Sequence, residues 1–442
     1  MAKKIGFISL GCPKNQVDSE LMLKKLTDAE YEITDTPIGA DAVIINTCGF
    51  IEAAKQEAID NILEMAGYKE DGDVGKIIVV GCMAERYRDE ILTEMPEVDA
   101  VAGLGANGDI VEFVNSVFED GEKSLFPPKD RLPLCGERLL TTPPHWAYLK
   151  IADGCSNCCT YCAIPKIRGP QRSRTIESVV EEAKTLVANG AKELIIVAQD
   201  VTRYGDDIYG EPKLDELLKE LDKIDDVNWI RLLYCYPDRL TDSVLEVIKN
   251  SKHVLHYIDL PLQHADGRIL KDMNRHGDRQ SLTSLIEKIR DCMPDCVIRT
   301  TFITGFPGED EEAFETLSEF VEDVRFDRLG CFAYSAEEGT VAYNMPDRPE
   351  KEVAEHRGEV IMDQQYKIFC EKQQELIGTV AECVIEEYDG YSDVYIGRTW
   401  RDAPEIDSGI FIVTDDEYEL GSFVNVKITD TKDYDLIGEV VD

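Results

Sequence analysis

The first third of the chain alternates short apolar runs with longer segments of helical period. β-Branched and other apolar residues fill three runs, at 4–10, 42–46 and 76–80. Amphipathic segments follow the runs, at 19–29, 53–65 and 87–95. Short apolar runs bounded by small residues are typical of buried strands, and the longer segments predict helices. This order predicts an α/β domain with a Rossmann-like parallel sheet.

A second alternation of the same kind occupies the middle of the chain, after a predicted helix at 109–119 and a proline-containing linker. Predicted strands lie at 146–151, 193–198, 229–234, 257–260, 297–303 and 328–334. Predicted helices lie between them, at 177–189, 213–221, 241–250, 279–291 and 310–321. About six βα units predict a full or partial (β/α) barrel, whose chemistry is expected at the carboxyl ends of its strands.

The pattern changes again after a long predicted helix at 350–377. Short β-rich runs at 380–385, 409–412, 423–428 and 436–440 are separated by turn residues, which predicts a small antiparallel β-barrel. We therefore expect an α/β protein of three domains, covering residues 1–140, 141–375 and 376–442.

The charge of the chain indicates which kind of macromolecule it can bind. The 442 residues carry a net charge of −41, and residues 376–442 hold only four basic residues, Arg398, Arg401, Lys427 and Lys432, against seventeen acidic ones. Such a field repels a nucleic-acid backbone and attracts a cationic protein. A basic protein partner is therefore expected and tRNA is not, although solubility or a salt-adapted host would also explain the charge.

Nothing in the sequence predicts export or membrane insertion. Leu10-Gly11-Cys12 resembles a lipoprotein cleavage site, but the apolar run before it, at 5–10, is shorter than the ~7–15 residues of a signal sequence. No run approaches the ~20 apolar residues of a membrane span. We expect a cytoplasmic protein, in which fourteen cysteines favour metal or redox chemistry over disulfides.

Each of the three apolar runs in the first third ends in a small residue followed by a cysteine. These cysteines are Cys12, Cys48 and Cys82. Because parallel strands end at one edge of a sheet, where ligands of such sheets bind, the three thiols are expected to converge. Three buried apolar cysteines would be an ordinary alternative, which the placement beyond successive strands disfavours.

A second cysteine triad follows the first strand of the predicted barrel. Cys155, Cys159 and Cys162 have the spacing C-x3-C-x2-C. Thiolates suit zinc and iron–sulfur clusters alike, but zinc sites want four ligands, usually from a second Cys or His pair about 12–20 residues on. No such pair follows Cys162, which favours a cubane cluster with one open iron. Cys158 offers a competing C-x2-C with Cys155, and we expect it to be a spare thiol.

Other polar residues lie at predicted strand ends or beside the second triad. Gln199 and Asp200 close one strand, and Gln263 and His264 follow another, where such groups hold polar ligands or simply cap turns. A basic cluster follows the second triad and either binds an anionic group or forms a solvated rim; it consists of Lys166, Arg168, Arg172 and Arg174.

Over essentially its whole length the sequence closely resembles the methylthiotransferases, a radical-SAM family. The resemblance rests on Gly11-Cys12-Pro-Lys-Asn, Asn46-Thr-Cys48-Gly-Phe, Gly81-Cys82-Met-Ala-Glu-Arg, the second triad with Tyr161 before its last cysteine, and a terminal barrel of the TRAM type. It implies two [4Fe-4S] clusters, held by the two triads, with S-adenosylmethionine as cosubstrate and an electron donor. Tyr161, Gln199 and Gln263 are expected to hold the cosubstrate, and no acid or base residue is implied.

Within this family the chain resembles the branch that modifies a ribosomal protein. The matching segments are Ile164-Pro-Lys-Ile-Arg-Gly, Ala198-Gln-Asp200, Gly397-Arg398 and Asp402-Ala-Pro-Glu-Ile-Asp407. This resemblance implies addition of a methylthio group to the β-carbon of an aspartate in small-subunit ribosomal protein S-twelve. Modification of a tRNA adenosine is the alternative activity, and a non-catalytic metal scaffold is the alternative of another class.

Overall fold

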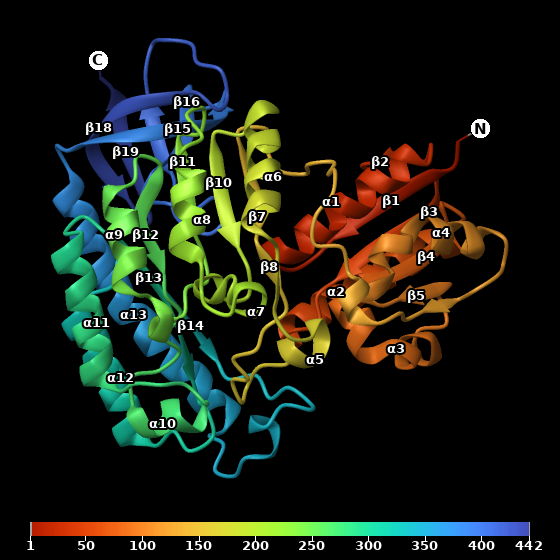
Figure 1. Ribbon diagram of the computed structural model, residues 1–442, viewed down its shortest axis with the longest axis horizontal. Helices are drawn as coiled ribbons and strands as arrows, with labels where there is room; N and C mark the ends of the chain where they lie inside the picture. Colours follow the sequence, from red (N-terminus) through yellow and green to blue (C-terminus); the bar gives the residue numbers. More distant parts are fainter. Residues whose placement is uncertain (1, 442) are drawn as a thin grey trace.

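A computed structural model describes residues 2–441, which form three parts in the order of the chain (Figure 1). The first part, here called the N-terminal sheet, is a six-stranded sheet in the order β2-β1-β3-β4-β5-β6 with parallel pairings throughout. Its strands are β1 (Lys4–Ser9), β2 (Glu32–Thr34), β3 (Ala40–Thr47), β4 (Val74–Gly81), β5 (Ala100–Ala102) and β6 (Ser124–Leu125).

Helices cover both faces of the N-terminal sheet, which is why its strands read as continuous apolar runs. They are α1 (Pro13–Asp28), α2 (Glu52–Glu70), α3 (Cys82–Glu94) and α4 (Ile110–Phe118), with short 3-10 turns at Leu104–Asp109 and Lys129–Arg131. Val43 and Ile45 of β3 pack in the core beneath α2 and α3, whereas Ile44 packs in the core beneath α1 and α4. The predicted Rossmann-like arrangement is confirmed.

The second part, the central sheet, has the order β14-β13-β12-β11-β10-β7, again with parallel pairings. The strands are β7 (Trp146–Lys150), β10 (Glu193–Val197), β11 (Trp229–Leu232), β12 (Val254–Asp259), β13 (Val297–Thr304) and β14 (Arg328–Ala333). Because β7 and β14 do not pair with each other, the predicted barrel is a partial one.

Helices pack on the outside of the central sheet and bury its apolar face in the largest core of the molecule. The predicted helices are present as α6 (Ile176–Ala188), α8 (Leu214–Leu221), α9 (Asp242–Asn250), α11 (Arg279–Cys292) and α12 (Glu311–Val324). Shorter elements were not predicted, because a few residues carry no measurable period. They are β8 (Ala152–Asp153), α5 (Ile164–Arg168), β9 (Arg172–Ser173), α7 (Asp206–Tyr209) and α10 (Gly267–Asp272), with 3-10 turns at Val201–Arg203, Pro237–Arg239 and Ala342–Asn344.

The third part, the C-terminal barrel, follows the long helix α13 (Lys351–Leu376). Its strands are β15 (Val380–Asp389), β16 (Val394–Thr399), β17 (Ile410–Val413), β18 (Phe423–Lys432) and β19 (Asp435–Val440), closed in the order β15-β16-β17-β19-β18. The small barrel is confirmed, with one parallel pair, β17 and β19, among its antiparallel ones. No helix among residues 2–441 is both long and apolar enough to span a membrane.

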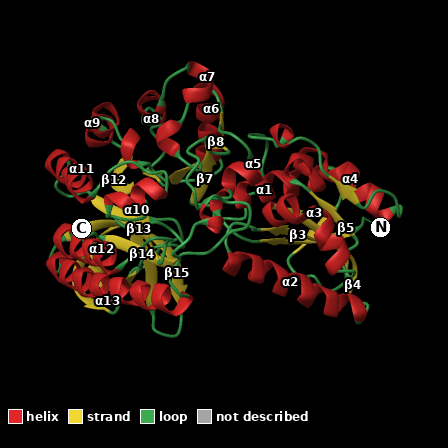
Figure 2. Ribbon diagram, turned by 90° about the horizontal axis from the view of Figure 1, so that it is seen from below, coloured by secondary structure: helices red, strands yellow, loops and turns green. Residues whose placement is uncertain are grey.

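The three parts leave the two ends of the central sheet in different surroundings. The C-terminal barrel lies at the amino ends of the central strands, where Trp229 donates to Glu382 at 2.8 Å. The N-terminal sheet lies beside the other end, and Figure 2 shows loops from both sheets meeting between them. The carboxyl ends of both sheets thus face a common space.

Candidate active site between the two sheets

The structure brings both cysteine triads to one cavity. Cys12 precedes α1, Cys48 follows β3 and Cys82 begins α3, so the first triad lies at the carboxyl ends of three adjacent strands. The second triad lies on the loop between β8 and α5. A cavity of about 1530 Å³ is lined by all members of both triads, which are Cys12, Cys48, Cys82, Cys155, Cys159 and Cys162.

Two glycines allow the loops of the first triad to pack this closely. Gly11 has a φ of +94°, and a Cβ there would lie 2.7 Å from the Cβ of Cys48 and 3.2 Å from its Sγ. Gly81 has a φ of +95°, and a Cβ there would lie 2.3 Å from Oδ1 of Asn46. Any larger residue is both strained and obstructed at these positions, so the approach of the thiols depends on glycine.

Burial and nearby cations set the protonation of the first triad. Burial raises the pKa of Cys82 to about 12 and also raises the pKa of Cys48. Burial acts in the same direction on Cys12, but Lys14 and Arg168 reverse it and leave the pKa of Cys12 below its ordinary value. Metal ligation requires thiolates, so a metal bound by this triad would release protons from it.

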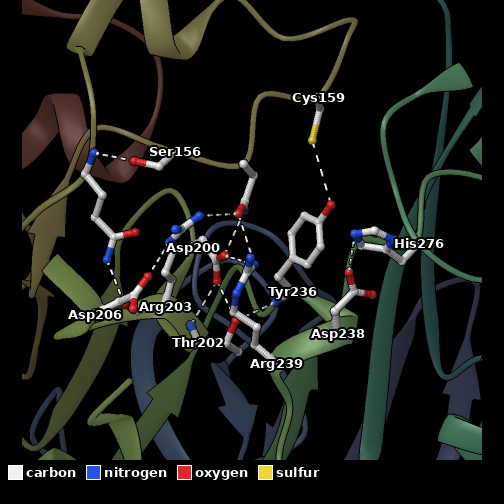
Figure 3. A network of polar contacts seen from close by, with 12 residues as sticks. Ser156, Cys159, Asp200, Thr202, Arg203, Asp206, Tyr236, Asp238, Arg239 and His276 are labelled. Atoms are coloured by element: carbon white, nitrogen blue, oxygen red, sulfur yellow. Dashed lines mark hydrogen bonds and ion pairs between the residues drawn. The ribbon is translucent and has the colours of Figure 1, made fainter. Parts of the chain in front are cut away.

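The second triad is similarly buried. Burial raises the pKa of Cys155 to about 11 and that of Cys162 to about 12. Cys159 Sγ lies 4.0 Å from the hydroxyl of Tyr236 (Figure 3) and 3.9 Å from Nη1 of Arg275. A hydroxyl and a guanidinium therefore lie beside this sulfur.

A buried ion cluster joins the loops that carry the two triads. Asp18 of α1 accepts from Lys150 of β7 and lies 2.9 Å from Nη2 of Arg168. Asp153 accepts from the same two cations, at 3.3 Å from Lys150 and 2.7 Å from Arg168. All four side chains are at most 1% exposed. Their pairing fixes the loop after Cys162 against the helix after Cys12.

The residues predicted to hold a cosubstrate all line the cavity. These are Tyr161, Gln199 and Gln263. The amide nitrogen and oxygen of Gln199 are buried and have no hydrogen-bond partner among the described residues. Tyr161 accepts from Nη1 of Arg275 at 3.4 Å. Gln263 has a φ of +74°. Unpaired amide atoms at a cavity wall are typical of a site that binds a polar ligand.

Other polar residues near the strand ends have structural partners instead. Asp200 accepts from Asn157 at 2.8 Å and from the backbone of Thr202 at 3.0 Å, which anchors the second triad's loop (Figure 3). His264 lies 3.2 Å from Glu309, both fully buried. Asp200 and His264 therefore stabilise the structure around the cavity.

Each member of the basic cluster after the second triad has a partner within the protein, although Lys166 remains exposed. Arg168 belongs to the buried ion cluster, Arg174 pairs with Glu182 at 2.5 Å, and Arg172 donates to the carbonyl of Asp130 at 2.6 Å. Lys166 donates to the carbonyl of Gly339. Because Arg168 and Arg174 are buried, the cluster as a whole does not form a solvated rim, whereas the exposed Lys166 agrees with that alternative.

Cys158 is placed as a spare thiol. It is exposed, with a φ of +56°, and its sulfur lies 3.7 Å from the carbonyl oxygen of Ser156. It is not among the residues that line the cavity. Four further cations at the cavity wall were not predicted as site residues, namely Lys14, Arg275, Arg348 and Lys351. In the sequence, the position of Lys14 two residues after Cys12 could have indicated a site residue, whereas nothing in the sequence indicated Arg275.

Three family models match the chain, in the order of its three parts. Uncharacterized protein family UPF0004 matches residues 4–103, the Radical SAM superfamily residues 149–321, and the TRAM domain residues 377–441. Relatives named ribosomal protein uS12 methylthiotransferase RimO match along their full length. The one from Acetivibrio thermocellus is 46% identical over 100% of this chain and 99% of its own, and that from Desulforamulus reducens is 48% identical over 99% of each.

The chain belongs to the RimO family of radical-SAM methylthiotransferases.

Solved structures agree on the fold. The radical S-adenosylmethionine methyltransferase TsrM from Kitasatospora setae superimposes with a TM-score of 0.56 at 12% identity, covering 75% of this chain and 73% of that protein. The cobalamin-dependent S-adenosylmethionine radical enzyme OxsB gives a TM-score of 0.51, covering 83% of this chain and 58% of that protein. At such identity the likeness concerns the fold alone.

Members of this family use S-adenosylmethionine and two [4Fe-4S] clusters as cofactors, and the donor set of the cavity fits them. Each triad supplies three thiols, which suit iron–sulfur clusters. Among the residues that the structure describes, no three His, Cys, Asp or Glu side chains are gathered tightly enough for a single metal ion. The unpaired amide of Gln199 suits a polar cosubstrate.

Proposed function

We propose that this methylthiotransferase adds a methylthio group to the β-carbon of an aspartate in ribosomal protein uS12. The observation that carries the proposal is the shared cavity of the two thiol triads, in a chain whose full-length relatives bear that name. The reaction needs an electron donor as a further partner. We place the enzyme in the cytoplasm, and we divide its chain into domains at 1–140, 141–375 and 376–442.

In this proposal each triad holds one cluster. Cys12, Cys48 and Cys82 are the ligands of the first, and Cys155, Cys159 and Cys162 those of the second. When bound, a cluster with an open iron reduces S-adenosylmethionine and so supplies the radical that removes hydrogen from an unactivated C–H bond. Tyr161, Gln199 and Gln263 hold the polar groups of the cosubstrate beside the second triad.

The chain's own apolar residues protect this chemistry. Phe50 and Ile51 reach the cavity from the N-terminal sheet, and Ile164, Ile303 and Phe332 reach it from the central one. An apolar wall excludes water and stray hydrogen-atom donors from reactive groups. The cavity is also larger than the ~300–1,000 Å³ that a small ligand alone fills, which leaves space for a substrate loop.

Electrostatics favours a protein substrate over tRNA. The net charge of −41 and the acidic C-terminal barrel attract a basic ribosomal protein and repel phosphates. Modification of a tRNA adenosine therefore stays the second candidate. Tight and steeply salt-dependent tRNA binding would count in its favour.

The test uses anaerobically purified, cluster-reconstituted enzyme with dithionite, S-adenosylmethionine and a synthetic peptide of the uS12 loop. We expect the peptide to gain about 46 Da, the mass of SCH3 replacing H, localised to an aspartate, because only covalent transfer changes its mass. Parallel reactions contain intact uS12, small ribosomal subunits or tRNA. A methylthio group found on tRNA and on no protein would contradict the proposal.

A further inference from the structure

A buried lysine lies in the cavity beside the first triad. Lys14 is the second residue of α1, two positions after Cys12, and is only 6% exposed. Its side chain lines the cavity, where Nζ lies 3.3 Å from the ring centroid of Tyr234, just beyond β11 of the central sheet. The ammonium group is thus held at the junction of the two sheets by an aromatic face.

The charge of Lys14 has no carboxylate partner. Nearby Lys150 and Arg168 are both neutralised by Asp18 and Asp153. Within residues 2–441, by contrast, Lys14 forms no ion pair with a carboxylate. A buried charge is costly unless it is paired. Lys14 lies close enough to Cys12 to lower the pKa of its thiol, and with no carboxylate partner it also marks a place in the cavity where a further anionic group binds.

The acidic side chains that line the cavity differ from Lys14, because most of them are exposed. Four of them, Glu52, Asp347, Glu350 and Glu355, are exposed. Glu52 pairs with Lys55 at 2.5 Å and Glu355 with Lys351 at 3.3 Å, which leaves Asp347 and Glu350 without a lysine or arginine partner among the described residues. Glu337, which is buried, is neutralised by Arg86 at 2.7 Å and Lys55 at 3.3 Å. The net charge of −41 and the exposed carboxylates of Asp347 and Glu350 attract a basic segment, while the buried lysine binds an acidic side chain. This pattern fits one aspartate within a basic loop.

We propose that Lys14 binds the side-chain carboxylate of the substrate aspartate and thereby selects aspartate over its amide. The inference rests on the proposed function. Because the β-carbon is bonded to the carboxylate carbon, the same contact holds the reacting carbon next to the first triad. Lys14 is therefore both a specificity residue and a substrate-positioning residue.

The test measures binding rather than turnover. Reconstituted enzyme with S-adenosylmethionine and no reductant is titrated with two synthetic uS12-loop peptides that differ only by Asp or Asn at the modified position. Hydrogen bonds to charged groups are the stronger ones, so Lys14→Met is expected to weaken binding of the Asp peptide at least about tenfold and to leave the Asn peptide within about twofold. Lys14→Gln is expected to give the same pattern.

A matched control lies on the same sheet. Lys3 also places its ammonium over an aromatic ring, 3.4 Å from the centroid of Phe118, but it is exposed and distant from the cavity lining. Lys3→Met is expected to leave both peptides unaffected. Iron and sulfide contents of Lys14→Met should equal those of the wild type, because Lys14 is not proposed as a ligand.

The outcomes separate this inference from the proposed function. Equal weakening of both peptides in Lys14→Met, or an undiminished preference for Asp, would overturn the role of Lys14. Equal binding of both peptides by the wild-type enzyme would also overturn the role of Lys14. Failure of the wild type to methylthiolate the peptide, intact uS12 and the ribosomal subunit would instead overturn the proposed function, and with it the inference.

Discussion

The two ends of the central sheet differ in how they treat polar groups. At the amino end, Glu193 of β10 pairs with Arg231 of β11 and with Arg398 of β16, each at 2.7 Å and each at most 4% exposed. Burial opposes ionisation there, but Arg398 and Arg231 hold the pKa of Glu193 below its usual value. At the carboxyl end, the amide of Gln199 has no hydrogen-bond partner among the described residues, and it faces a cavity that is also lined by the six thiols.

The amino end is closed by the loop between β16 and β17. Tyr257 of β12 donates to Asp407 at 2.6 Å, and Arg231 donates to the carbonyl of Trp400 at 3.0 Å. A sheet of this kind binds its ligands at the carboxyl end, so its amino end is free to serve stability. The comparison teaches that one end stabilises the sheet while the other keeps donors available for cofactors and substrate.

The largest effect is expected from removing the second triad. Replacing Cys155, Cys159 and Cys162 by Ala should abolish formation of deoxyadenosine from S-adenosylmethionine and lower iron from about eight to about four per chain. Chromatography of the nucleoside and an iron assay measure both. Deoxyadenosine retained in the triple variant would contradict the assignment of this triad.

The reciprocal triple variant tests whether the two triads have separate roles. Replacing Cys12, Cys48 and Cys82 by Ala should also leave about four irons per chain, but deoxyadenosine should still form and the peptide should gain no methylthio group. Peptide mass and nucleoside yield are measured in the same reaction. Normal transfer by this variant would show that the first triad is dispensable.

A single glycine should act on the first triad alone. Gly11→Ala places a Cβ 2.7 Å from that of Cys48 at a φ of +94°, so iron should fall toward about four per chain while deoxyadenosine formation persists. Gly67→Ala is the matched control, since a Cβ there meets nothing within 4 Å. Full iron content in Gly11→Ala would mean that the loops are not packed as described.

At the amino end a substitution should affect stability and not chemistry. Glu193→Gln leaves Arg231 and Arg398 buried without their carboxylate, at a cost of roughly 3–5 kcal/mol. Hydrogen exchange of β10 and β16 amides should report this loss as easier local opening, whereas deoxyadenosine formation should stay within about twofold. Glu216→Gln, in an exposed pair with Lys213, should change stability by less than about 0.5 kcal/mol.

The smallest effect is expected at Cys158. Because its thiol is exposed and outside the cavity lining, Cys158→Ala should leave iron content and deoxyadenosine yield unchanged. Loss of half the iron in this variant would make Cys158 a ligand and displace one member of the second triad.

Much of this organisation was predictable from the sequence, because buried parallel strands give apolar runs and their ends mark a site. The positions of Cys12, Cys48 and Cys82 beyond three strands follow from that pattern alone. Strand β16 was missed because Gly397 and Arg398 interrupt its apolar character.

Pairings between distant residues were not predictable. Asp18 and Lys150 are 132 positions apart, and Glu193 and Arg398 are 205 apart. A sequence shows Arg168 and Arg174 as surface-like charges, because burial and partner become visible only when the sheets are assembled. The positions of Lys14 and Arg275 at the cavity wall depend on the same long-range assembly.

The central claim is that both triads face one cavity, and the most direct test compares magnetic spectra of the reduced clusters. Electron paramagnetic resonance is recorded for the wild type and for each triple-Ala variant, which keeps only one cluster. Two clusters in one cavity should interact, so the wild-type spectrum should be broadened and relax faster than the sum of the two variant spectra. A wild-type spectrum equal to that sum would contradict the claim.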